Sequence, residues 1–181
     1  MKSPWRGINN YLASALLVAI LAGCASADRS NQRKAQAVVQ LFLEAEFDTG
    51  DKTEVVPIYR SAPVPIRVFK APFLDSGSLI DASVVDTMGG FSIVLKFDFH
   101  GKLALEHVST AYKGNRIAVH AQFPERRWLA APRVSTRITD GVLAFAPDAT
   151  REEAVRIVHG LNNVAVKLGN KPKPGSKKQT D

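Results

Sequence analysis

The sequence feature that most constrains the fold is a regular alternation over residues 91–99. Every second residue there is large and apolar: Phe91, Ile93, Leu95, Phe97 and Phe99. A period of two places these five side chains on one face of a β-strand. That face needs a second layer of structure, because a sheet with an uncovered apolar face is not stable in water.

Other segments carry strand and helix signals in turn. Alternating residues predict strands over residues 116–123 and 142–145, and the Pro-rich stretch before them fits an edge strand over residues 64–70. Helical spacing predicts helices over residues 29–47 and 100–113, and a third that begins after Thr150. The pattern predicts an α+β fold, a single two-layer domain with an antiparallel or mixed sheet and helices on one face.

Charge is concentrated at the two ends of the chain. The 181 residues include 24 Lys and Arg against 17 Asp and Glu, a formal net charge of +7. Lys2 and Arg6 lie in a stretch without acidic residues, and the last fifteen residues hold five lysines. The middle of the chain is nearly neutral, so no nucleic-acid partner is expected. Hydrophobic residues make up 45% of the chain, which excludes a wholly disordered or collagen-like protein.

The N-terminal residues have the anatomy of an export signal. A basic start precedes an apolar run over residues 11–22, which is shorter than the ~20 residues needed to span a bilayer as a helix. The run ends in four residues that resemble the lipobox of bacterial lipoproteins: Leu21, Ala22, Gly23 and Cys24. The resemblance implies cleavage before Cys24 and diacylglycerol on its thiol. The alternative is an ordinary secretory signal with an incidental cysteine.

An acylated Cys24 implies a lipid-anchored protein of the bacterial envelope that faces the periplasm. Ala25 stands where lipoproteins retained in the inner membrane often carry Asp, which favours the outer membrane.

We expect four segments along the chain. They are a lipoprotein signal peptide (1–23), an N-terminal helix with a Pro-rich extended stretch (24–69), an α+β domain (70–166) and a disordered Lys- and Pro-rich tail (167–181).

The sequence contains no recognisable catalytic constellation. The four histidines, His100, His107, His120 and His159, show no compact metal-ligand spacing, and no serine-hydrolase or phosphate-loop motif occurs. Asp98 and Glu106 are carboxylates that the sequence alone does not bring together. We therefore expect no catalytic residues, no metal, no cofactor and no enzymatic activity.

One group of residues is suited to binding. Arg126, Arg127 and Trp128, with Arg133 and Arg137 nearby, place cations beside an aromatic ring, which suits an anionic group or an extended peptide. The alternative is a hairpin tip with solvated arginines and a tryptophan packed on the core.

Residues 70–165 resemble the head part of the first periplasmic domain of SecD, the accessory subunit of the bacterial preprotein translocase. Four motifs carry the resemblance: GNRIAV (114–119), AAPRV (130–134), RITDG (137–141) and DATREEA (148–154). The segment 124–127 departs from the Asp-Gly turn usual in that family. SecD also has transmembrane helices that couple the proton gradient to movement. We expect none here, and therefore no translocation motor.

The resemblance implies a role in export or envelope assembly. We expect a binding module for exported polypeptides, which offers a sheet edge and a neighbouring groove to an extended chain. The alternative is a structural accessory subunit that docks to one fixed partner in a membrane complex, and a third hypothesis is a hydrolase of unknown type.

Overall fold

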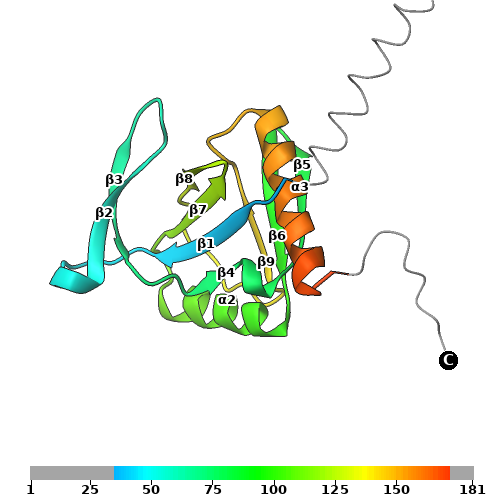
Figure 1. The fold of residues 1–181 in the computed structure, drawn as a ribbon. Helices are drawn as coiled ribbons and strands as arrows, with labels where there is room; N and C mark the ends of the chain where they lie inside the picture. Colours follow the sequence, from blue (N-terminus) through cyan, green and yellow to red (C-terminus); the bar gives the residue numbers. More distant parts are fainter. Residues whose placement is uncertain (1–34, 172–181) are drawn as a thin grey trace, which may run out of the picture. The chain divides into compact units, whose positions relative to one another are not determined.

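The structure is a computed structural model that describes residues 35–171 (Figure 1). The predicted signal peptide and the lipidation site, Leu21 to Cys24, lie outside the described residues, as do residues 172–181 of the predicted tail. Residues 35–171 belong to one compact unit. Neither of its α-helices is long and apolar enough to cross a membrane.

The strands of this unit form three antiparallel sheets. The four-stranded sheet has the order β4 (Leu74–Asp75), β1 (Val38–Leu43), β7 (Ile117–Phe123), β8 (Glu125–Ala130). The three-stranded sheet has the order β5 (Leu79–Thr87), β6 (Gly90–Phe97), β9 (Val142–Phe145). The third sheet is a hairpin of β2 (Thr53–Ile58) and β3 (Val64–Phe69). Short 3-10 turns occur at η1 (Gly50–Lys52) and η2 (Ser76–Ser78).

Two helices complete the α+β fold. Helix α2 (Phe99–Ala111) contacts β6, and α3 (Arg151–Leu168) packs along β5 (Figure 1). The main core lies among these helices and the two larger sheets, and it includes Leu41, Leu95 and Ile157. A second core lies where the β2–β3 hairpin packs against β1 and β8, and it includes Phe42, Ile58 and Val68.

The alternation at residues 91–99 forms strand β6, as predicted, with one correction at its end. Ile93, Leu95 and Phe97 are buried, but Phe99 begins helix α2 and is 68% exposed. The strand ends because the Asp98 carboxylate accepts a hydrogen bond from the Gly101 N–H at 2.8 Å and so caps the helix.

The helix predicted over residues 29–47 is wrong where the structure describes it. Residues 38–43 form strand β1, which pairs with β7 from Val38 to Leu43. Apolar side chains fill both faces of this strand, since Leu41 lies in the main core and Phe42 in the hairpin core. A strand buried on both faces shows no clean alternation, and a short apolar run of this kind is readily mistaken for a helix.

The final helix begins as predicted but continues into the expected tail. The Thr150 hydroxyl accepts a hydrogen bond from the Glu153 N–H at 3.2 Å. Lys167 and Leu168 still belong to α3, which ends at Gly169 with a left-handed φ of 84°. Beyond it, Lys171 forms an ion pair with Asp81, so the prediction of disorder from residue 167 is wrong for residues 167–171.

Candidate functional site

The two outer edges of the three-stranded sheet differ in how their backbone groups are satisfied. On the β5 side, the side-chain amide of Asn162 in α3 forms hydrogen bonds with both the backbone N–H and the backbone C=O of Ala82. Its Oδ1 accepts from the Ala82 N–H at 3.0 Å, and its Nδ2 donates to the Ala82 carbonyl at 2.7 Å. This side-chain amide closes that part of the β5 edge to further pairing.

The β9 edge is open by comparison. The Phe97 N–H donates to the Gly141 carbonyl at 3.0 Å, and the register continues with Leu95 opposite Leu143. Bonded and non-bonded pairs alternate in an antiparallel ladder, so the backbone groups of Val142 and Ala144 point outward, away from β6.

Only one of these outward groups has a partner within residues 35–171. The Val142 N–H donates to the Asp140 Oδ1 at 3.0 Å. The backbone of Ala144 makes no hydrogen bond to the described residues beyond its strand, and Ala144 is exposed. An unpaired strand edge of this kind is a template for another extended chain.

The segment after β8 forms the opposite wall. The Ile117 N–H donates to the Pro132 carbonyl at 2.9 Å, and the Val134 N–H donates to the Asn115 carbonyl at 2.8 Å. These two bonds flank the isolated bridge of Arg116 and Arg133. The backbone N–H and C=O of Arg133 consequently point away from Arg116.

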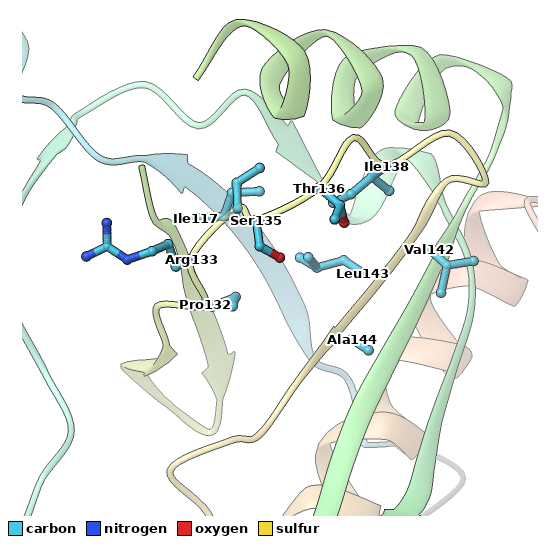
Figure 2. Close-up of a pocket in the computed structure, with 10 residues that line it drawn as sticks. Ile117, Pro132, Arg133, Ser135, Thr136, Ile138, Val142, Leu143 and Ala144 are labelled. Carbon is cyan, nitrogen blue, oxygen red and sulfur yellow. The ribbon is translucent and has the colours of Figure 1, made fainter. Parts of the chain in front are cut away.

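A hollow of about 200 Å³ lies between the two walls (Figure 2). Its floor is apolar, since Ile117, Val134 and Leu143 are each at most 5% exposed. Ser135 and Thr136 contribute hydroxyl groups, and Figure 2 shows the Ser135 hydroxyl directed toward Leu143. We call this site, bounded by residues 132–136 and β9, the edge groove.

The edge groove combines the two requirements for binding an extended chain. The Ala144 backbone offers one donor and one acceptor that do not depend on the side chains of the bound chain. The apolar floor offers a place for one side chain that points inward. Arg133 contributes backbone only, because its side chain is directed away from the hollow and bonds the Gly114 carbonyl at 2.5 Å.

The predicted binding residues of β8 do not form one site. Side chains alternate along the strand, so Arg126 and Trp128 lie on one face and Arg127 on the other. Trp128 is half-buried against Phe42 and His120, with ring centroids 5.2 Å and 4.9 Å away.

Arg127 points toward helix α3 instead. Its Nη2 lies 2.7 Å from a carboxylate oxygen of Glu153, and its side chain is only 15% exposed. Glu153 also pairs with Arg60 of the hairpin loop, whose N–H donates to Asp148 at 2.9 Å. Arg127 therefore ties β8 to α3.

The histidines lie in four separate environments. His100, His107 and His159 are exposed, and His120 is half-buried beside Trp128. Burial lowers the pKa of His120, the positive Arg126 lowers it further, and Glu54 opposes both.

The two carboxylates weighed as a catalytic pair have structural partners. Asp98 caps helix α2, and Glu106 forms an ion pair with Arg137. Among the described residues, no group of three His, Cys, Asp or Glu side chains is placed to hold a metal ion.

Sequence reasoning missed the residues of the edge groove. Residues 142–145 are a strand, as predicted, but periodicity does not tell whether a strand lies at an edge. Ala144 is exposed between the buried Leu143 and Phe145, but this is known only from the fold, and no local sequence signal marks the edge.

The fold is similar to solved structures of SecDF. A structure described as that of a membrane component SecDF that enhances protein export has a TM-score of 0.54 and 22% identity, over 77% of this chain and 68% of that one. SecDF in its super-membrane-facing form has a TM-score of 0.55 and 21% identity, over 77% of this chain and 20% of that one. SecDF from Thermus thermophilus aligns with 23% identity and a TM-score of 0.43.

The first two comparisons confirm the SecD-like α+β fold that the four sequence motifs predict. No protein-family model matches the chain, and no curated protein sequence matches it significantly. At these identities the likeness concerns the fold, and function has to be argued from the site.

Proposed function

We propose that this protein is an envelope lipoprotein whose domain binds extended extracytoplasmic polypeptides in the edge groove, in protein export or envelope assembly. The observation that carries the proposal is the unpaired backbone of Ala144, an exposed residue beside an apolar hollow. The protein acts by binding, without catalysis. One of the similar structures is described as a component that enhances protein export, which agrees with this class of partner.

Binding proceeds by addition of a strand to β9. The incoming chain pairs with the outward N–H and C=O of Ala144, and every second side chain of that chain faces the floor of the groove. One main-chain hydrogen bond contributes about 1 kcal/mol net. A few such bonds and one apolar contact give weak, sequence-tolerant binding, which suits a protein that meets many different chains.

The lipid anchor supplies the location. In this proposal Cys24 carries the acyl chains and holds the domain, described from Ala35 onward, at a membrane surface. The domain then meets polypeptides at the periplasmic surface of a membrane, with the outer membrane favoured by Ala25.

A pair of variants at one position tests strand addition. Proline at an outward-facing edge position removes the free N–H and keeps the ladder bonds of its neighbours. Ala144→Pro should weaken binding of a fluorescent peptide of alternating Val and Thr about fivefold or more, because at least one main-chain bond is lost. Ala144→Val keeps the N–H and should bind like the natural protein. Equal binding by both variants, measured by fluorescence anisotropy on the folded full-length protein, would refute the proposal.

A second measurement separates this function from the accessory-subunit alternative. A photo-crosslinking amino acid at Thr136, on the rim of the groove, is activated in native membranes and the captured proteins are identified. Many unrelated exported chains are the expected result. Capture of one stoichiometric envelope protein would instead establish a subunit that docks to a fixed partner.

A further inference from the structure

A second hollow, of about 350 Å³, lies between the segment after β1 and the C-terminal end of α2. Three aromatic residues from three different parts of the chain line it. Phe47 follows β1, Phe69 ends β3, and Tyr112 is the C-cap of α2. Phe47 is 75% exposed and Tyr112 40% exposed. Phe69 is partly buried against the main core, so two exposed aromatic side chains flank the hollow, and exposed apolar groups gathered at one hollow are typical of a binding surface.

One unpaired carboxylate and the C-terminal end of a helix lie at the same hollow. Glu46 is exposed, and its carboxylate makes no hydrogen bond or ion pair with any other residue between 35 and 171. Glu44 is neutralised, since its carboxylate accepts from the Arg116 N–H at 2.7 Å and lies 3.8 Å from the Arg116 guanidinium. Ala111, the last residue of α2, also lines the hollow, and the carbonyls at a helix C-terminus carry partial negative charge.

We infer that this hollow, the aromatic pocket, binds the cationic side chain of a lysine or arginine. Aromatic faces attract cations through their quadrupole, and recognition of organic cations typically surrounds the charge with several rings. The free carboxylate of Glu46 supplies the counter-charge, and the C-terminus of α2 adds to it. An acidic ligand would be repelled by this carboxylate.

The position of the aromatic pocket favours a polypeptide over a lipid as the source of the cation. The pocket is adjacent to the edge groove, because the Asn115 carbonyl accepts the Val134 N–H of the groove at 2.8 Å and Asn115 also lines the pocket. An extended chain in the groove can therefore place a basic residue in the pocket. The identity of the partner thus rests on the proposed function, whereas the preference for a cation rests on the pocket alone.

Two matched peptides test the inference on the folded full-length protein. Both alternate Val and Thr, and they end in either lysine or norleucine, which has nearly the same shape without the charge. The natural protein should bind the lysine peptide about two- to fivefold more tightly, the range expected of an exposed cation–π contact. Glu46→Gln should reduce the preference by removing the counter-charge, and Phe47→Leu should reduce it by removing one ring while keeping an apolar side chain. Phe99→Leu, an exposed aromatic outside the pocket, is the control and should leave it unchanged.

The outcomes separate the two proposals. Ala144→Pro should weaken both peptides equally and keep the lysine preference. An intact lysine preference with no effect of Ala144→Pro would overturn strand addition and leave the pocket standing. Equal binding of the two peptides to the natural protein, or a preference unaffected by Glu46→Gln, would overturn the pocket. Glu46-dependent binding to vesicles of phosphatidylethanolamine, but not of phosphatidylglycerol, would overturn the polypeptide source.

Discussion

Gly160 controls how closely helix α3 approaches strand β1. A Cβ at this position would lie 2.8 Å from both the Cβ and the backbone nitrogen of Ala37. Backbone atoms cannot move aside easily, so Gly160→Ala should lower the free energy of unfolding by about 1–3 kcal/mol. This loss outweighs the ~1 kcal/mol that alanine gains over glycine in a helix. Urea unfolding measures it, and Gly90→Ala, where a Cβ meets nothing within 4 Å, is the control. Equal stability of the two variants would contradict the close approach.

His120 makes stability depend on pH near neutrality. Its pKa in the folded state lies below the ordinary 6.5, chiefly because burial disfavours the charged ring. The unfolded chain therefore binds the proton more readily, and folding stability should fall as pH drops from about 7 toward 5. His120→Gln should flatten this part of the stability curve. An unchanged slope in the variant would show that other groups cause it. The pKa of the exposed Asp86 is also lowered, by its hydrogen bond from Arg151. Its contribution to folding stability is therefore lost only in acid, below the ordinary carboxylate pKa of 3.8.

At the scale of elements, sequence patterns identified strands whose large apolar residues alternate, and missed the strand that carries them on both faces. The alternation in β6 and β7 identified both strands, and the signals at Thr150 located the start of α3. Strand β1 was assigned to a helix because the hairpin core on its outer face exists only after β2 and β3 fold back over it. The periodicity of a short segment cannot show that residues distant in the sequence will bury its second face.

The same distinction applies to the candidate site. The motif at residues 137–141 predicts the turn before β9, but the openness of the β9 edge depends on which segments come to lie beside it. The three residues predicted to bind together on β8 are adjacent in sequence. Because side chains alternate along a strand, Arg127 pairs with Glu153 of α3, whereas Trp128 packs against the hairpin core. The structured end of α3 likewise depends on a distant partner, since Lys171 pairs with Asp81.

The hydrogen bonds between Asn162 and the backbone of Ala82 close the β5 edge of the three-stranded sheet, and removing them tests whether this edge would otherwise be open. Asn162→Ala should leave the N–H and C=O of Ala82 without partners, at a cost of about 1–3 kcal/mol for such buried groups. It should also open the β5 edge, so that the protein self-associates at high concentration. Thermal unfolding and sedimentation measure the two effects. A variant that is destabilised but stays monomeric would show that α3 still covers the edge.

At the scale of the whole unit, the residues that stabilise the fold and the residues proposed to bind partners lie in different regions. The main core and helix α3 stabilise the sheets, and α3 also covers the β5 side of the smaller one. On the other side, the edge groove and the aromatic pocket lie next to each other around residues 112–117 and 132–136. We expect variants in Arg127 or Asn162 to change stability, and variants in Ala144 or Glu46 to change binding with little effect on stability.

Hydrogen exchange at single-residue resolution tests the central claim most directly. The full-length protein is compared with and without a saturating concentration of the Val-Thr peptide. Strand addition predicts that exchange of the Ala144 amide slows strongly on binding, together with the Arg133 amide on the opposite wall, while the bonded amides of β6 change little. Protection that leaves Ala144 unchanged and appears along β8, around Arg126 and Trp128, would contradict the account and return the binding site to the outer strand of the four-stranded sheet.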